Sequence, residues 1–398
     1  MAGAPEASGA AQGSSTPSPQ KPSAQNSSTL HPSSLQRLPV ALDAMGGPGS
    51  EVLIRGAIRA CRDGHGPILL VGREAELSAD LDRLLGQVRD ADAIRGQLTL
   101  VDAPQMIGAG EHPGRAARTK TDSSIHVALR AVQQGDACAM ISSGNTGALL
   151  ASALLTLRRV PQCDRPAVVG CLPTERDPIV LLDVGANQEC RASHLMQFAL
   201  MGSAFAQHEL GLERPRVGLL SGGTELSWAT ETHREAHRLL VGADLNYLGP
   251  LDAQSMLKGE VDVVVADGFT GRIAARVAEA AAKALMGRIR QSITGDWIGA
   301  LGARLLKKSM RRVREALDDA RTGAAPLLGV EGVAVAIHGQ AAEISVVRAV
   351  QMARRHHEAD LVSALRAALL NTPGDGEPLT TAELPITRAT GAHSGGGS

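Results

Sequence analysis

Ala137–Ile141 is an apolar run that passes directly into SSGNTGA, residues 142–148, and from there into a segment with helical spacing. The same order recurs where Ile179–Leu182 leads into DVGAN, residues 183–187. A buried strand that ends in small polar residues and opens a helix directs backbone N–H groups and the positive end of the helix dipole at one point. Small side chains let an anion approach the backbone closely. These stretches therefore predict a parallel sheet whose strand ends bind a phosphate group or another oxyanion.

The rest of the chain extends this pattern. Strand-like and helix-like segments alternate over residues 38–370, which is typical of a parallel sheet covered by helices. Val261–Ala266 is a further buried-strand pattern, and it runs into DGFTG, residues 267–271. We expect the three junctions to share one sheet edge, at the carboxyl ends of the strands. The predicted strands at Ala167–Leu172 and Pro178–Asp183 are close in sequence. They could form a hairpin or a local antiparallel patch, and the sequence alone does not decide between these arrangements.

Composition narrows the function classes. The chain has 398 residues, of which 43% are hydrophobic and 20% charged, as in globular proteins with a core. A net charge of −1 and an aromatic content of 2% argue against a nucleic-acid partner. The five cysteines show neither C-x-x-C nor zinc spacing, which fits reduced thiols in a cytosol. No metal or organic cofactor is expected. Residues 1–37 and 371–398 are rich in small and polar residues and predict disordered tails.

Residues 285–317 predict a helical hairpin with an amphipathic second arm. Gly295-Asp296 would break the helix, and the second arm carries an apolar stripe that includes Trp297, Ile298 and Leu301 opposite a Lys/Arg face. Such a basic amphipathic helix lies on an anionic membrane surface or meets an acidic partner. A surface helix packed on its own core, with a solvated basic face, explains the pattern equally well.

Nine strings in a fixed order resemble the PlsX-type phosphate acyltransferases, over roughly residues 38–350. They are ALDAMGG at 41–47, KTDSS at 120–124, SSGNTGA at 142–148, the stretch from RPA at 165–167 to PT at 173–174, LDVGAN at 182–187, QFALMG at 197–202, VGLL at 217–220, DVVV through DGFTG at 262–271, and PLLGV at 326–330 leading to His338-Gly339.

The resemblance implies a three-layer α/β/α sandwich, similar to the isocitrate and isopropylmalate dehydrogenases and to phosphotransacetylase, with a projecting helical hairpin. It implies an enzyme that transfers a fatty acyl group from acyl carrier protein to inorganic phosphate, which forms an acyl phosphate for phospholipid synthesis. It further implies a cytoplasmic homodimer that can lie on the inner face of the cell membrane, functionally coupled to a membrane glycerol-3-phosphate acyltransferase.

Some residues depart from the family pattern. Pro48 stands where an acidic residue is usual, and the stretch 221–229 has Trp228 in place of the expected lysine. Two alternatives follow: a catalytically impaired homologue that binds acyl carrier protein or scaffolds lipid synthesis, or a phosphotransacetylase-like acyltransferase. An NAD(P)-dependent hydroxyacid dehydrogenase shares the fold class, but no G-x-G-x-x-G follows the first strand.

The first junction is the main candidate for the phosphate. Ser143, Gly144, Asn145 and Thr146 would bind it through backbone N–H groups and the Asn and Thr side chains, with a ligand-free helix cap as the alternative. The turn of Asp43, Gly46 and Gly47 either lets a ligand approach the backbone closely or is a tight turn without a ligand. Lys120, at a predicted helix start in the KTDSS string, would add positive charge.

The remaining candidates would handle protons and the leaving group. Asp183 and Asn187 would position the protons of the anion, or else form an Asx-turn that braces the strand end. At the third junction, Thr270 would offer its hydroxyl to phosphate beside Gly268, and Asp267 would accept its proton. His338 follows a strand and would protonate the departing thiolate or bind the phosphate. A hydrogen-bonded structural histidine is the alternative there.

Overall fold

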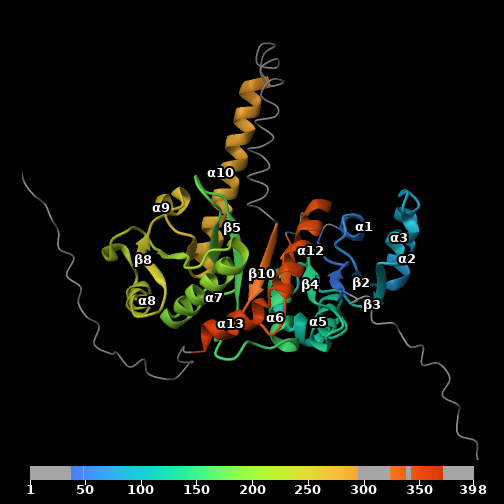
Figure 1. Ribbon diagram of the computed structural model, residues 1–398, viewed down its shortest axis with the longest axis horizontal. Helices are drawn as coiled ribbons and strands as arrows, with labels where there is room; N and C mark the ends of the chain where they lie inside the picture. The colour runs from blue at the N-terminus through green and yellow to red at the C-terminus, as the bar shows by residue number, and fades with distance from the viewer. Residues whose placement is uncertain (1–36, 48, 295–322, 338–341, 371–398) are drawn as a thin grey trace, which may run out of the picture. The chain divides into compact units, whose positions relative to one another are not determined.

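The computed structural model describes residues 37–47, 49–294, 323–337 and 342–370 (Figure 1). The unit that begins at Leu38 holds all the helices and strands described. The strands are β1 (Val40–Asp43), β2 (Ile68–Gly72), β3 (Leu98–Asp102), β4 (Ala139–Ser142), β5 (Ala167–Leu172), β6 (Ile179–Leu182), β7 (Arg216–Leu220), β8 (Asn246–Leu251), β9 (Val263–Val265), β10 (Ala324–Leu328) and β11 (Ala334–Ile337). The α-helices are α1 (Ser50–Arg62), α2 (Glu74–Leu85), α3 (Ala91–Arg95), α4 (Pro113–Thr119), α5 (Ser124–Gln134), α6 (Thr146–Thr156), α7 (Ala192–Leu210), α8 (Glu231–Val241), α9 (Ala253–Lys258), α10 (Gly268–Thr294), α12 (Glu343–Glu358) and α13 (Leu361–Leu369).

All eleven strands form one sheet in the order β3-β2-β1-β4-β11-β10-β5-β6-β9-β7-β8. The first five strands in this order run parallel, and so do the last four. Between them, β10 is antiparallel to β11 and to β5, and β5 is antiparallel to β6. The predicted mostly parallel sheet is confirmed, and its two parallel halves run in opposite directions.

This reversal makes the expectation of one shared sheet edge wrong. The strands β1 and β4 end at one edge, whereas β6 and β9 end at the opposite edge. The physical reason is the short connection at residues 173–178, since parallel neighbours need a crossover of a dozen or more residues. Of the two arrangements left open for β5 and β6, the antiparallel one is therefore what forms.

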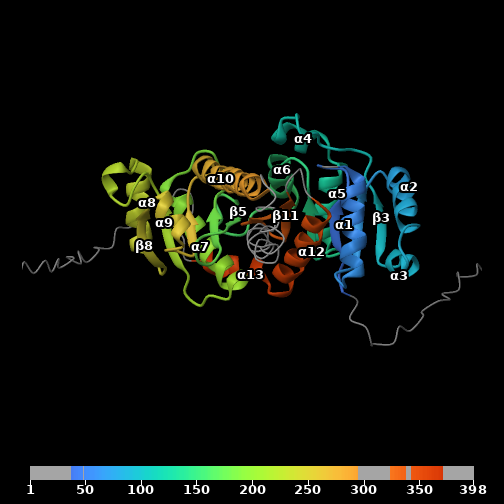
Figure 2. The ribbon, with the colours of Figure 1, turned by 90° about the horizontal axis from the view of Figure 1, so that it is seen from above.

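Helices cover both faces of the sheet (Figure 2). Because successive side chains of a strand point to opposite faces, each strand contributes to both cores. On β1, Val40 and Leu42 pack in the core under α1, α2 and α12, and Ala41 packs on the opposite face under α5 and α6. On β6, Val180 and Leu182 pack under α7, α8 and α13, and Leu181 packs under α9 and α10. The three-layer α/β/α sandwich is confirmed.

The helix α10 departs from the expected boundary. It continues without interruption through Leu285 to Thr294, so the first arm of the predicted hairpin is the end of a longer helix. The predicted tip at Gly295-Asp296 and the second arm lie outside the described residues. Among the helices that the structure describes, none combines the length and the apolar character needed to cross a bilayer.

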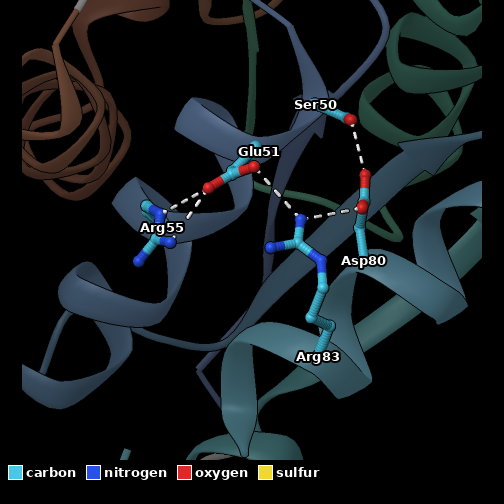
Figure 3. A network of polar contacts seen from close by, with 5 residues as sticks. All are labelled: Ser50, Glu51, Arg55, Asp80 and Arg83. Carbon is cyan, nitrogen blue, oxygen red and sulfur yellow. Dashed lines mark hydrogen bonds and ion pairs between the residues drawn. The ribbon is translucent and has the colours of Figure 1, made fainter. Parts of the chain in front are cut away.

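A polar network fixes the start of α1, just after the first glycine-rich turn (Figure 3). Ser50 Oγ donates to Asp80 Oδ2 at 2.8 Å, and Arg83 Nη2 donates both to Asp80 Oδ1 at 3.0 Å and to Glu51 Oε2 at 3.1 Å. Because Glu51 and Arg83 are each about half exposed, this network orients α1 against α2 without contributing much stability.

Candidate functional site

The first junction is built on two neighbouring parallel strands, with Asp43 opposite Ser142. The Asp43 carboxylate is buried and accepts hydrogen bonds from the Ser142 hydroxyl at 2.7 Å and from the Met45 N–H at 3.1 Å. Burial raises the pKa of Asp43, and these hydrogen bonds oppose the rise. Asp43 thus holds together the two turns that follow β1 and β4.

The two turns are pressed against each other. Ser143 Oγ donates to the Gly46 carbonyl oxygen at 2.8 Å. A Cβ atom on Gly46 would lie 2.7 Å from the Gly144 nitrogen, and Gly47 has a φ of +71°, so neither position accepts a side chain without strain. The structure therefore brings together the predicted residues Asp43, Gly46, Gly47, Ser143 and Gly144.

Asn145 caps α6, as the helix-cap alternative describes. Its Oδ1 accepts from the N–H groups of Gly147 at 2.9 Å and Ala148 at 3.3 Å, and Thr146 is the first residue of the helix. The side-chain oxygen is thus committed to the cap, and any anion here would meet the remaining N–H groups and the dipole of α6. Binding by Asn145 stays a prediction.

Lys120 is not at a helix start. It is the C-cap of α4, and its ammonium donates to the Met106 carbonyl at 2.9 Å and to Glu111 Oε1 at 2.7 Å. The Lys120 hydrogen bond holds the pKa of Glu111 below its usual range, so Glu111 is ionised and offsets the lysine charge. The positive charge expected from Lys120 is therefore largely neutralised within its own pair.

Next to this junction lies a buried histidine that the sequence patterns did not single out. His126 Nδ1 is 2.9 Å from Ser123 Oγ and 3.5 Å from Ser152 Oγ. Burial lowers the pKa of His126, with a smaller lowering from nearby Arg130. A His three residues after an N-cap Ser was the available signal. Its contacts make it a brace between α5 and α6.

Asp183 forms the centre of the second junction. Oδ1 accepts from the N–H groups of Val168 at 3.0 Å, Gly185 at 3.1 Å and Ala186 at 3.0 Å. Oδ2 accepts from Asn187 N at 2.6 Å and Nδ2 at 3.0 Å. With its side chain fully buried, Asp183 occupies the bracing position that the Asx-turn alternative describes.

The second and third junctions form one unit. Gly268, the first residue of α10, donates its N–H to the Asn187 carbonyl at 2.7 Å, and a Cβ here would lie 2.6 Å from Asp183 Oδ2. Asp267 caps α10, because Oδ1 accepts from Thr270 N at 2.8 Å and Oδ2 from Thr270 Oγ1 at 2.7 Å. The predicted residues of these two junctions are thus brought together, on the half-sheet opposite to Asn145.

Two further placements complete the site. Arg272, which the sequence patterns did not single out, lies over the second junction: a Cβ on Gly185 would be 3.2 Å from Arg272 Nη1. Its position one turn into α10, beside the DGFTG string, was the signal for it. His338 lies outside the described residues. Within the ranges that the structure covers, His, Cys, Asp and Glu side chains form no group of three placed to bind a metal.

The architecture itself has a counterpart among solved structures. A phosphotransacetylase from Streptococcus pyogenes superposes with a TM-score of 0.53 at 16% identity, over 83% of this chain and 94% of that one. The protein therefore has the α/β/α fold of the phosphotransacetylases, with helix-capping turns at the strand ends.

The sequence comparisons go further. The model of a family described as "Fatty acid synthesis protein" matches residues 38–364. The chain is 37% identical over 331 residues to the phosphate acyltransferase of Pelotomaculum thermopropionicum, which covers 83% of this chain and 94% of that protein. It is 39% identical over 320 residues to the phosphate acyltransferase of Syntrophotalea carbinolica, with 80% and 90% covered. The chain belongs to this fatty acid synthesis family and is an acyltransferase.

Proposed function

We propose that this protein transfers a fatty acyl group from acyl carrier protein to inorganic phosphate, forming an acyl phosphate for phospholipid synthesis. The observation that carries the proposal is the junction of Asp43, Ser142 and Asn145. At this junction two glycine-containing turns pack at the N-terminus of α6. Their backbones lie so close together that no Cβ atom fits between them. Such a site favours a compact oxyanion over a bulky ligand.

The chemistry needs no covalent enzyme intermediate. A phosphate oxygen attacks the thioester carbonyl carbon, the carbonyl oxygen becomes an oxyanion, and the C–S bond then breaks to release the carrier-protein thiolate, which takes up a proton. The protein has to hold the phosphate, orient the thioester and stabilise the oxyanion. On the second half, Arg272 and the N-terminus of α10 supply positive potential for that charge.

The decisive assay uses the purified protein, palmitoyl-acyl carrier protein and inorganic phosphate. It measures release of the free carrier-protein thiol and traps the acyl phosphate with hydroxylamine. Thiol release that depends on phosphate supports the proposal. A folded protein that binds the carrier protein and gives no turnover would instead favour the impaired homologue, and turnover with coenzyme A thioesters alone would favour a phosphotransacetylase-like enzyme.

Asn145 offers a sharper test of where the phosphate binds. Asn145→Asp keeps the side-chain oxygen that caps α6 but adds a negative charge at the expected anion position. We expect the KM for phosphate to rise by about tenfold or more, equivalent to about 1.4 kcal/mol. Asn145→Ser, which also retains a cap, should leave that KM close to its original value. Equal KM values for phosphate in both variants and the wild type would place the phosphate elsewhere.

We extend the proposal to assembly and location. The expected homodimer, the cytoplasmic enzyme resting on the inner face of the membrane and the coupling to a membrane glycerol-3-phosphate acyltransferase are supported by the family membership. Leu285, with 61% of its surface exposed, presents apolar surface where the segment 285–317 begins. Replacing both Trp297 and Leu301 with Asp should abolish co-sedimentation with anionic vesicles and leave activity in solution intact. Unchanged co-sedimentation would contradict the membrane proposal.

A further inference from the structure

A groove of about 410 Å³ lies between α9 and the first half of α10. Met256 and Leu257 of α9 form one side, and Phe269, Ile273 and Val277 of α10 form the other. Most of its lining is aliphatic or aromatic, and its size falls within the range of about 300–1,000 Å³ typical of small-molecule sites. The groove is therefore the right size and polarity for an apolar ligand.

The polar groups of the groove are at one end. Ser221 follows β7 and Thr270 lies in the first turn of α10, and both strands that lead to them end at the same sheet edge because Leu219 pairs with Val265. The Thr270 hydroxyl donates to Asp267, and the neighbouring Gly268 contacts Asn187. This end of the groove thus opens at the second and third junctions.

From that end the groove follows α10 from Thr270 to Ala281, a rise of about 16 Å at 1.5 Å per residue. Ala274, Ala278 and Ala281 are small and leave this path open. Phe269 and Val277 are each 61% exposed and Ile273 is 48% exposed, which is a contiguous strip of solvent-facing apolar surface. Exposed apolar surface of this kind marks a binding site more often than a solvated face.

We infer that this groove binds the fatty acyl chain of the thioester substrate, with the carbonyl at Thr270 and Ser221 and the methyl end toward Ala281. The inference rests on the proposed function, since it assigns a place to that reaction's acyl group. A polar mouth at the candidate site, joined to a long apolar path, matches a thioester head joined to a hydrocarbon tail. Each methylene that leaves water for the groove should strengthen binding by about fourfold.

The test is chain-length selectivity. Ala278→Phe places a ring across the path two turns beyond the mouth. We expect the wild type to prefer palmitoyl over hexanoyl carrier protein, and the variant to lose about tenfold or more in kcat/KM for palmitoyl with a much smaller loss for hexanoyl. Ala280→Phe is the matched control, because Ala280 is exposed on the same helix and does not line the groove. This control should keep the wild-type selectivity.

A second readout does not depend on turnover. A palmitoyl chain with a diazirine near its methyl end, carried on acyl carrier protein, should label peptides of α9 and α10 on illumination, and Ala278→Phe should suppress the labelling. If the wild type shows no phosphate-dependent thiol release, the proposed function fails, and labelling still decides whether the groove binds an acyl chain.

Two results would overturn the inference. One is labelling outside α9 and α10 together with unchanged chain-length selectivity in Ala278→Phe. The other is a change of oligomeric state in Ala278→Phe, measured by light scattering, with chain-length selectivity retained, which would assign the groove to contact with a second copy of the chain.

Discussion

In each half of the sheet, a buried aspartate stabilises the turn after a central strand, but the two aspartates have different hydrogen-bond donors. In the first half, Asp43 ends β1, and its carboxylate accepts from the Ser142 hydroxyl and the Met45 N–H, with further hydrogen bonds from Ser124 and Gly46. In the second half, Asp183 follows β6 and receives five N–H donors. A carboxylate that accepts from five N–H groups makes a rigid turn, whereas the first turn uses hydroxyl donors and close glycine packing beside the helix N-terminus that we propose for the phosphate.

The difference fits the separate tasks that we propose for the halves. The first half would bind the phosphate, and the second half joins a rigid turn to the apolar groove along α10. Although the strands of the halves run in opposite directions, the two sets of loops approach each other, because Val184 and Ala186 of the second junction pack against the core cluster that contains Ala148 of α6. Substitutions that affect one half alone can therefore test the division.

The largest effect is expected at Gly271. A Cβ atom here would overlap the backbone carbonyl oxygen of Asp183, so Gly271→Ala must move α10 away from the second junction. We expect a loss of about 3 kcal/mol in the free energy of unfolding, measured by urea denaturation. Gly287→Ala, on the same helix with no atom near its Cβ position, should instead stabilise the protein by about 0.5 kcal/mol. Equal values for both would contradict a tightly packed second half.

The next largest losses in the free energy of unfolding are expected when the buried carboxylates of Asp183 and Asp43 are replaced. In Asp183→Asn either orientation of the amide sets its NH₂ group against N–H donors, so we expect a loss of about 2 kcal/mol. In Asp43→Asn the amide can donate to the Ser142 oxygen while its own oxygen still accepts from Met45, so the loss should be about 1 kcal/mol. Thermal denaturation of the pair measures the difference, and the reverse order would refute the stated contrast.

A smaller effect is expected to distinguish the half-buried ion pair of Asp262 and Arg216 from an exposed ion pair. Burial acts to raise the pKa of Asp262, but hydrogen bonds from the Arg216 side chain and backbone outweigh it, so the pKa lies below its ordinary value. Its stabilisation is thus present above the unfolded-state pKa of about 4 and is lost as the pH falls through the lower folded-state value. Asp262→Asn should cost about 1 kcal/mol at pH 7 and remove this part of the acid sensitivity.

The control for that prediction lies in the first half. Glu51 pairs with Arg83 in the exposed network of Figure 3. Glu51→Gln should give no measurable change in unfolding at pH 7, because solvent and salt screen the pair. Parallel acid-unfolding curves for Asp262→Asn and Glu51→Gln would show that the partial burial of the Asp262 pair does not strengthen it.

Local sequence patterns predict much of the fold. The alternation of apolar strands and helices located the strands at Ala139–Ser142, Ile179–Leu182 and Val263–Val265, because buried parallel strands are continuous apolar runs. Strand direction was not predictable at the same level, since it depends on the pairing of β10 with β5 and of β11 with β4, strands that are distant in sequence. The short connection before Ile179 was the one local sign of the reversal.

The candidate site was predictable in its residues but less so in their roles. The turns of Asp43, Asp183 and Asp267 form as expected, since a short polar side chain after a strand accepts from N–H groups two or three residues further along the chain. Whether a carboxylate is free or saturated depends on tertiary N–H donors such as Val168, which no spacing reveals. The ion pair of Lys120 was not predictable for the same reason, because its partner Glu111 is brought in by the fold of a preceding loop.

The most direct measurement puts both halves into one kinetic experiment. Phosphate-dependent thiol release is recorded for the wild type, Asn145→Asp and Ala278→Phe, with phosphate concentration and acyl-chain length varied independently. We expect Asn145→Asp to raise the KM for phosphate at every chain length without altering chain preference. Ala278→Phe should alter chain preference and leave the KM for phosphate unchanged. If either variant shifts both parameters together, or if neither shifts its own, the assignment of phosphate to one half and acyl chain to the other is contradicted.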